Sequence, residues 1–268
     1  MSSMRILVCV KAVPGSTEVK MDPKTNTIVR DGGSAVLNPF DASALEVALA
    51  LKDAAAAGDP VRVTVLSMGI PATAKILRDC IARGADDAIL LSDRAFAGAD
   101  TLATTYALSL GAAAMGEAPD LVLCGKMAVD GDTAQIGPEL AGALGIPCVA
   151  DVAELVSLAD GALTVRHATD AGVATVELAL PALLTVAKDI AQLRMPSIAG
   201  VRAAEDAPVR VLSAADAGAD SARCGLAGSP TQVVRSFVPE RSGAAERVEG
   251  TAAGQAAKLV DLLGGMGL

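Results

Sequence analysis

Short runs rich in β-branched residues alternate with longer, alanine-rich segments of helical period from about residue 4 to residue 150. This alternation is typical of a parallel sheet whose strands are joined by crossover helices. The expected strands span residues 5–13, 61–68, 88–91 and 121–124, and the expected helices span residues 42–56, 72–82, 101–115 and 133–144. Proline and glycine lie at the joins, where the chain is expected to reverse. The pattern therefore predicts an α/β fold built on a doubly wound, mostly parallel sheet.

The pattern changes between residues 148 and 186, where apolar residues tend to alternate with small or polar ones. Such a period of two is typical of half-buried strands, and Asp160-Gly161 and Ala171-Gly172 are typical of the turns between them. We therefore expect antiparallel strands that extend the edge of the parallel sheet.

The last part of the chain has a weaker pattern. Residues 203–223 are mostly small, acidic and turn-prone, so we expect them to be irregular, and a final helix is expected near residues 254–263. We predict one α/β domain over residues 1–223 and an extended C-terminal arm over residues 224–268. An arm with its own apolar anchors, separated from the core by linkers, is expected to pack on a partner.

Reactive side chains are scarce. Among 268 residues there is a single histidine, His167, with no tryptophan, one tyrosine and three phenylalanines. This scarcity excludes most histidine-based catalysis, multi-histidine metal centres and aromatic platforms for stacking bases. We interpret His167 as an ordinary strand residue, and we predict neither a catalytic residue nor a metal site. A net charge of −9 also disfavours a nucleic-acid partner.

The cysteines and the apolar segments bear on the compartment. The five cysteines are odd in number and form no C-x-x-C pair, which favours a reducing cytoplasm over a disulfide framework. No uninterrupted apolar stretch reaches the ~20 residues of a membrane span, and the first ten residues lack the pattern of a signal peptide. We therefore expect a cytoplasmic protein with no membrane span.

Candidate binding residues follow the expected strands. In a parallel α/β sheet, ligands collect beyond the carboxyl ends of the strands. The residues at these positions are Cys9, Val10, Lys11, Ser67, Met68, Gly69 and Gly125, with Asn38 just before the first helix.

The segment Asp130-Gly131-Asp132-Thr133-Ala134-Gln135 opens the last helix of the parallel half. Gly131 permits close approach of the backbone, and free amides at a helix N-terminus favour a phosphate. The alternative is that Asp132 or Thr133 merely caps the helix. Neither G-x-G-x-x-G nor G-x-x-x-x-G-K-[ST] is present, which disfavours a standard dinucleotide fingerprint and a P-loop.

Several separated motifs, in order along the chain, resemble those of one family. They are Val8-Cys-Val-Lys-Ala-Val-Pro14, Glu18-Val-Lys-Met-Asp-Pro23, Arg30-Asp-Gly32, Asn38-Pro-Phe-Asp41, the segment from Gly125 to Gln135, and the tail from Cys224 to Arg235. With these motifs, nearly the whole chain resembles the β subunit of electron-transfer flavoproteins. The resemblance implies a Rossmann-like, adenine-nucleotide-binding fold and a heterodimer with a larger α subunit that carries FAD.

The resemblance leaves two forms of the β subunit to consider. In simpler members the β subunit binds AMP, and in electron-bifurcating members the same pocket holds a second FAD. Gly131, Ala134 and Ile136 stand where the simpler form tends to carry an acidic residue, Asn and Thr. The chain is therefore similar to the bifurcating type. A non-redox adenine-nucleotide-binding module is the alternative from a different class.

For the bifurcating type, the resemblance implies that electrons come from NADH. One would pass through the α-subunit FAD to an acyl-CoA dehydrogenase-type partner, and the other to ferredoxin or flavodoxin. The implied FAD contacts are the backbone of Cys9, Val10 and Lys11, the Asn38 side chain, the lining residues Ser67, Met68 and Gly69, and residues 131–135 at the phosphates and ribose.

Residues 190–203 resemble the loop through which the family recognises its dehydrogenase partner. The resemblance implies that Ile198 is the apolar anchor that inserts into this partner. The alternative is that Ile198 fills the chain's own core.

Overall fold

The computed structural model describes residues 3–15, 35–55, 60–234 and 247–267. The chain divides into two compact units, Met1–Val233 and Val234–Leu268, and each is considered by itself. The motif segments at residues 18–23 and 30–32 lie outside the described residues, as does the end of the tail motif at residue 235.

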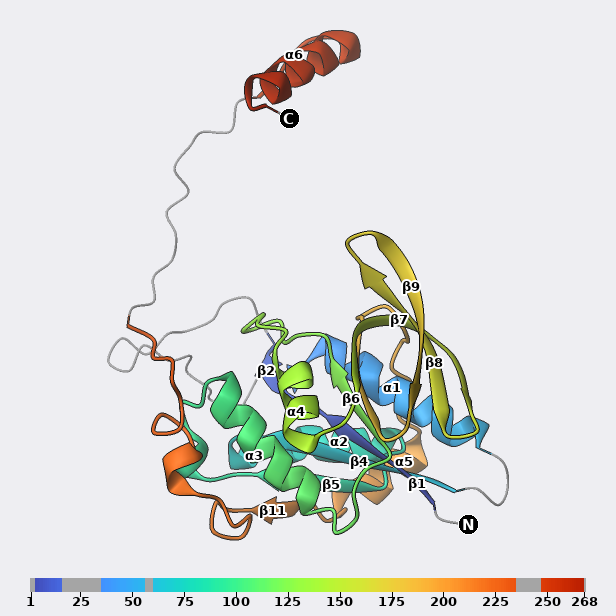
Figure 1. The fold of residues 1–268 in the computed structure, drawn as a ribbon, viewed down its shortest axis with the longest axis vertical. Coiled ribbons are helices and arrows are strands. Elements are labelled where there is room, and N and C mark those ends of the chain that lie inside the picture. The colour runs from blue at the N-terminus through green and yellow to red at the C-terminus, as the bar shows by residue number, and fades with distance from the viewer. Residues whose placement is uncertain (1–2, 16–34, 56–59, 235–246, 268) are drawn as a thin grey trace. The chain divides into compact units, whose positions relative to one another are not determined.

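The first unit is built on a nine-stranded sheet with an uninterrupted parallel part (Figure 1). Seven neighbouring strands are parallel and two further strands continue the sheet in antiparallel pairing. In spatial order they are β11 (Arg210–Leu212), β5 (Asp87–Leu91), β4 (Val61–Met68), β1 (Met4–Cys9), β6 (Leu121–Gly125), β10 (Ala182–Val186), β7 (Cys148–Ala159), β8 (Ala162–Thr169) and β9 (Gly172–Ala179). The predicted doubly wound, mostly parallel α/β sheet with an antiparallel edge extension is confirmed.

Helices cover both faces of this sheet (Figure 1). One face packs on α1 (Pro39–Ala54) and α2 (Ala74–Arg83), with α5 (Ile198–Glu205) packed against α2. The other face packs on α3 (Thr101–Ala113) and α4 (Ile136–Leu144). Successive residues of β1 enter opposite cores, because side chains alternate along a strand.

Short elements complete the first unit. Two strands pair antiparallel beside the main sheet, and three single turns of 3-10 helix connect larger elements. They are β2 (Ala12–Pro14), β3 (Ala35–Leu37), η1 (Pro71–Thr73), η2 (Arg94–Phe96) and η3 (Ser221–Arg223).

The expectation of antiparallel edge strands within residues 148–186 holds for only one side of β7, which pairs antiparallel with β8 but parallel with β10. It was wrong for β10. This strand lies between β6 and β7, parallel to both. All five of its residues are buried, since helices cover both of its faces. A continuous apolar run is typical of such an interior strand, whereas the period of two belongs to the half-exposed β7, β8 and β9.

Three other expectations differ in their boundaries. The expected strand over residues 5–13 is broken after Cys9, where the chain turns into the short β2. The expected helix over residues 133–144 begins only at Ile136, because positive φ at Asp132 and Ala134 keeps the loop out of helical geometry. The segment expected to be irregular contains part of α5 and the edge strand β11, which is too short to show a period.

Residues 224–233 lie in the first unit. Cys224 is buried in the core under α3, and the Ser229 hydroxyl accepts a hydrogen bond from the Asp100 amide at 2.9 Å. Asp100 also accepts hydrogen bonds from the amide and hydroxyl of Thr231. The N-terminus of α3 therefore holds the start of the segment that the sequence assigned to the arm.

The second unit contains α6 (Ala252–Gly265), which confirms the final helix expected near residues 254–263. Its first turn is capped by the Thr251 hydroxyl, which accepts from the Gly254 amide. Leu259, Val260 and Met266 are exposed on it. No helix among the described residues is long and apolar enough to cross a membrane.

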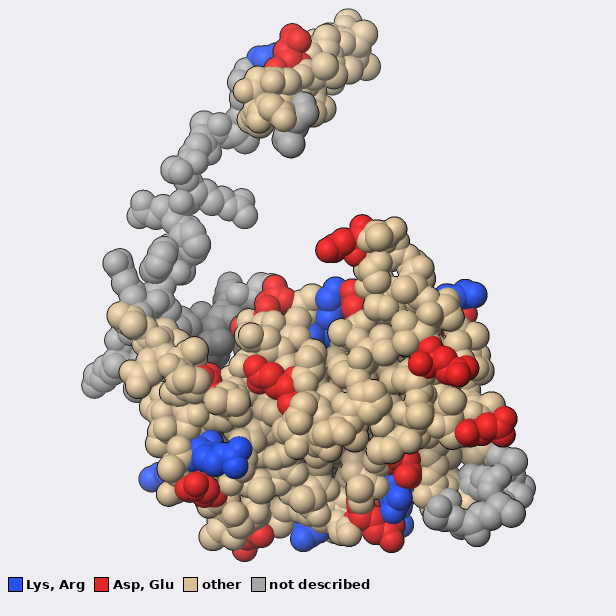
Figure 2. All heavy atoms as spheres, viewed as in Figure 1, with Lys and Arg blue, Asp and Glu red and all other residues tan. Residues whose placement is uncertain are grey.

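Charged side chains are spread over the surface of the first unit. On the described part of the face in Figure 2, lysine and arginine form small separate groups that alternate with aspartate and glutamate. Among the described residues, ion pairs join several such cations to acidic side chains, as in the pairs of Arg5 with Asp120 and of Arg62 with Asp87.

Candidate functional site

The carboxyl ends of four neighbouring parallel strands meet at one edge of the sheet. Cys9 at the end of β1 lies opposite Leu66 of β4 on one side and Cys124 of β6 on the other, and Cys124 lies opposite Thr185 of β10. The structure therefore brings together the candidate residues after β1, β4 and β6, which are far apart in the sequence.

An ion pair joins the segments that follow β1 and β6. The ammonium of Lys11 lies 2.5 Å from Oδ1 of Asp130, whose side chain is only 5% exposed. A buried carboxylate is stable when it is paired with a cation. This contact therefore helps to hold the segment after β6 against the segment after β1.

Asn38 holds the same segment through its side-chain amide. The amide nitrogen donates to the Met127 carbonyl at 2.9 Å, and the amide oxygen accepts from the Val129 backbone at 3.2 Å. Its backbone N–H donates to the carbonyl of Lys11 at 2.9 Å. Asn38 is fully buried, so it shapes the site through the backbone of residues 127–129.

The loop from residue 130 to residue 135 is a tight turn followed by uncapped amides. The amides of Gly131 and Asp132 both donate to the carbonyl of Ala128, at 3.1 and 2.8 Å. Within the described residues, the amides of Thr133, Ala134 and Gln135 have no hydrogen-bond acceptor. No side chain caps α4, and Gln135 occupies its N-cap position. The alternative in which Asp132 or Thr133 caps this helix is therefore wrong.

Gly131 faces open space in this loop. A Cβ added there would lie 3.9 Å from the Lys11 ammonium and, apart from the adjoining residues of the chain, within 4 Å of no other described atom. Free amides at a helix N-terminus favour an anion, and the open position leaves room for one. The donors and the space fit the pyrophosphate of a nucleotide.

The end of β4 contributes an unsatisfied hydroxyl. Ser67 is buried, and its hydroxyl is the one buried side-chain polar atom without a hydrogen-bond partner among the described residues. Next to it, Gly69 permits a close approach, because an added Cβ would lie 2.6 Å from the Thr73 hydroxyl. A buried hydroxyl with no partner is unusual and is consistent with a polar ligand at this edge.

The cysteines near this edge have the environment of packing residues. Cys9 and Cys124 lie side by side in the core, and contact with Cys9 together with burial raises the pKa of the Cys124 thiol. A raised pKa keeps the thiol protonated and unreactive. His167 lies on β8 opposite Val152, outside the group of candidate residues. No group of three or more possible metal ligands occurs in the part of the chain that the structure describes.

Asp41 is a residue of this edge that we did not predict. It lies in the first turn of α1, is buried, and accepts hydrogen bonds from the amides of Lys11 and Gly125. Burial raises the pKa of Asp41 to about 7, although hydrogen bonds from Asn38, Lys11 and Gly125 favour the carboxylate. The available signal was an acidic residue in the first turn after Asn38-Pro39.

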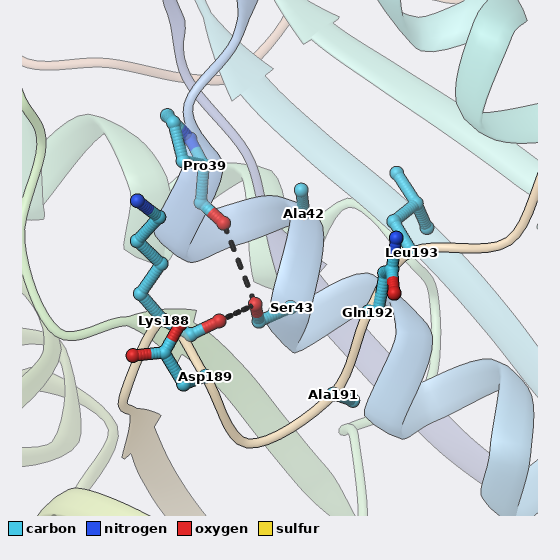
Figure 3. Close-up of a pocket in the computed structure, with 8 residues that line it drawn as sticks. All are labelled: Pro39, Ala42, Ser43, Lys188, Asp189, Ala191, Gln192 and Leu193. Atoms are coloured by element: carbon cyan, nitrogen blue, oxygen red, sulfur yellow. Dashed lines mark hydrogen bonds between the residues drawn. The ribbon is translucent and has the colours of Figure 1, made fainter.

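An open groove of about 440 Å³ lies beside the start of α1 and includes none of the predicted cofactor residues (Figure 3). The start of α1 and the segment 188–193 line this groove. Ser43 joins them, because it donates a hydrogen bond to the carbonyl of Lys188 (Figure 3). The lining residues are Pro39, Ala42, Ser43, Lys188, Asp189, Ala191, Gln192 and Leu193.

The segment that resembles a partner-recognition loop is anchored at one end and exposed at the other. Arg194 pairs with Glu46 and Asp53 of α1, and its carbonyl accepts from Arg83 of α2. The next apolar side chains point outward, because Met195 is 84% exposed and Ile198 is 78% exposed. The alternative in which Ile198 fills the chain's own core is therefore wrong.

With these features the chain is a doubly wound α/β protein whose sheet carries a loop with unpaired backbone amides, among the described residues, at its carboxyl edge. A family model described as the electron transfer flavoprotein domain matches residues 25–217. The chain is 47% identical over 246 residues to the electron transfer flavoprotein subunit beta of Megasphaera elsdenii, with 90% of each chain covered. It is 44% identical over 254 residues to subunit CarD of the caffeyl-CoA reductase-Etf complex of Acetobacterium woodii, with 95% of each covered. Protein FixA of Azorhizobium caulinodans is 45% identical over 242 residues, which are 88% of this chain and 85% of the relative.

Over nearly its whole length, the chain thus belongs to the β subunits of the electron transfer flavoprotein family.

Proposed function

We propose that this chain holds FAD at the carboxyl edge of its sheet, as the β subunit of a heterodimer with an FAD-carrying α subunit. In the complex, electrons from NADH are divided between two routes. One leads through the α-subunit FAD to an acyl-CoA dehydrogenase-type partner, and the other leads to ferredoxin or flavodoxin. The cytoplasm is the proposed location, since all five thiols are free.

The observation that carries this proposal is the uncapped loop before α4. Its three free amides, the open space at Gly131 and the nearby Lys11 ammonium, 3.9 Å from where a Cβ would stand on Gly131, fit a pyrophosphate. The unsatisfied hydroxyl of Ser67, on β4 across β1 from this loop, fits the polar edge of a nucleotide.

The bound FAD would supply the redox chemistry, namely acceptance of two electrons and their release one at a time. The chain's own residues would bind and orient it. The amides of residues 133–135 would donate to its phosphates, and the paired Lys11 would keep the adjoining loop in place. The scarcity of reactive side chains agrees with a protein that holds a redox group.

The partner surfaces follow from the exposed apolar residues. We assign Ile198, in the segment 190–203, to contact with the dehydrogenase partner, because it is exposed although apolar. We assign α6 and the preceding arm to contact with the α subunit, since a helix that exposes Leu259, Val260 and Met266 gains stability by burying them.

Flavin and nucleotide content tests the proposal. The chain is co-expressed with its α subunit, and FAD and AMP are counted after release from the purified complex. We expect about two FAD per heterodimer. One FAD and one AMP would replace the proposal with the simpler electron carrier, and an adenine nucleotide without flavin would replace it with the non-redox module.

NADH-dependent reduction of ferredoxin is the second measurement. We expect it to require the α subunit and an acyl-CoA dehydrogenase-type acceptor together, because the downhill transfer drives the uphill one. Ferredoxin reduction at the same rate without the acceptor would contradict a division of electrons.

A further inference from the structure

The carboxylate of Asp41 binds two loops at once. Its Oδ2 accepts from the backbone amide of Lys11 at 2.8 Å, and its Oδ1 accepts from the amide of Gly125 at 3.1 Å. The Lys11 amide stands two residues after the end of β1 and the Gly125 amide stands at the end of β6, and these are neighbouring strands. One buried side chain on α1 therefore fixes the exit points of both.

The backbone is shaped to let Asp41 approach. A Cβ added at Gly125 would collide with Oδ1 of Asp41 and would lie 2.6 Å from Cβ of Phe40. Only glycine permits this approach of β6 to the first turn of α1.

The neighbouring contacts extend the same arrangement. Asn38, three residues earlier, bridges the backbone of Met127 and Val129, and its own amide donates to Lys11. The side chain of Lys11 then pairs with Asp130. A chain of contacts therefore runs from Asp41 to the start of the loop with the free amides.

We propose that Asp41 is a positioning residue of the nucleotide site, which holds the loops after β1 and β6 in their binding geometry before the nucleotide arrives. This inference rests on the proposed function, because it concerns the same edge of the sheet. Asp41 acts through the backbone of Lys11 and Gly125 and need not contact the ligand.

A carboxylate suits this role better than its amide. Two converging N–H donors need two acceptor oxygens, and an ionised aspartate has both. In Asp41→Asn, the NH₂ group would face one of the two N–H groups and leave it unsatisfied. A buried donor without an acceptor is costly, so that loop would move away.

Protonation of Asp41 would have the same effect as the amide. The groups that face Asp41 are Lys11 after β1, Cys124 on β6, Cys80 on α2 and Asn38 beside it. Burial raises the pKa of Cys80 to about 12, and the pKa of Cys124 is also raised, so both thiols are neutral at physiological pH. Asp41, with a pKa of about 7, is therefore the member of this group that changes charge near neutrality.

The test is a titration of FAD into the flavin-depleted β site of the full heterodimer, for wild type and Asp41→Asn. Asp93→Asn is the matched control, because Asp93 also bridges two backbone amides, those of Ala95 and Ala214, but follows β5 and does not touch the loops after β1 and β6. We expect Asp41→Asn to weaken FAD binding by about tenfold or more, the effect of one unsatisfied buried hydrogen bond. Asp93→Asn should bind as wild type does.

A pH profile separates positioning from a loss of folding. Wild-type affinity for FAD should rise between pH 5.5 and 8.5 as Asp41 ionises, and the Asp41→Asn profile should be flat. The pyrophosphate of FAD does not titrate in this range. If Asp41→Asn does not fold, the wild-type profile alone decides, and a flat one overturns the proposal.

Two outcomes distinguish this inference from the proposed function. If the wild type binds FAD and Asp41→Asn binds it with equal affinity, the positioning role is overturned and the proposed function stands. Wild type that binds neither FAD nor AMP at the β site overturns the proposed function and this inference with it.

Discussion

Arg194 holds both carboxylate oxygens of Glu46, with Nη2 2.8 Å from Oε1 and Nε 3.0 Å from Oε2. The backbone amide of Arg194 donates to the same carboxylate at 3.0 Å. The pairing joins α1 to the segment that carries the exposed side chains of Met195 and Ile198. The chain just before these apolar residues is therefore held in a fixed position on α1.

We expect Arg194→Lys to weaken this attachment of the segment to α1. Lysine keeps the charge but loses the two-pronged contact, so the segment should become more mobile and the free energy of unfolding should fall by about 1–2 kcal/mol. With an acyl-CoA dehydrogenase-type partner, KM for the partner should rise while kcat stays near wild type. Arg166→Lys, at the exposed pair with Glu154, is the control. An unchanged KM for the partner would show that the Arg194–Glu46 ion pair plays no part in docking.

Ile198→Ala should affect docking without affecting folding. Because Ile198 is 78% exposed, we expect the free energy of unfolding to change by less than about 0.5 kcal/mol. A buried isoleucine would instead cost about 2–5 kcal/mol on truncation. Denaturant unfolding measures the effect on folding, and the affinity for the dehydrogenase partner measures the effect on docking. If Ile198→Ala binds that partner as tightly as the wild type does, Ile198 is not part of the docking surface.

Gly131→Asp should empty the β site selectively. The new carboxylate would stand among the free amides and repel the phosphates by about 1–4 kcal/mol. We expect the heterodimer to lose FAD from the β subunit and keep it in the α subunit, as measured by flavin content. Gly131→Ala is the control, because the added Cβ meets nothing closer than the Lys11 ammonium at 3.9 Å. Two retained FAD in Gly131→Asp would place the phosphates elsewhere.

Asp41 should make the stability of the chain fall as pH rises. Burial raises its pKa from 3.8 to about 7 in the folded state, so between these values the folded chain binds more protons than the unfolded one. The stabilisation is therefore fully present below about pH 4 and is lost as pH rises through 7. The difference in unfolding free energy between wild type and Asp41→Asn should decrease by up to ~1.4 kcal/mol per pH unit in this window. A difference that stays constant from pH 5 to 8 would show that Asp41 is not buried as a neutral acid.

Much of the fold could be predicted because its signals are local. The strands over residues 61–68 and 121–124 and the helix at 101–115 show their periods in short windows of sequence, and all three are present. The candidate residues after β1, β4 and β6 could likewise be predicted to meet, since parallel strands share a carboxyl edge.

The failures concern relations between distant segments. The position of β10 between β6 and β7 depends on pairing with strands that end well before it in the sequence, such as Ala182 with Leu121, and its own apolar run does not specify these partners. The late start of α4 depends on the conformations of Asp132 and Ala134, which are residues that rarely take positive φ. Neither is visible as a pattern along the chain.

The sequence by itself determined the class of fold, the edge where a ligand belongs and the family, because periods, strand ends and motifs are properties of contiguous residues. Only the tertiary structure decided that Ile198 is exposed, that Asn38 is buried against the backbone, and that Asp41 joins the loops at Lys11 and Gly125. These facts depend on burial and on hydrogen bonds between distant segments. Asp41 and Gly125, for example, are 84 residues apart in the sequence. Such contacts exist only once α1 has packed against the sheet.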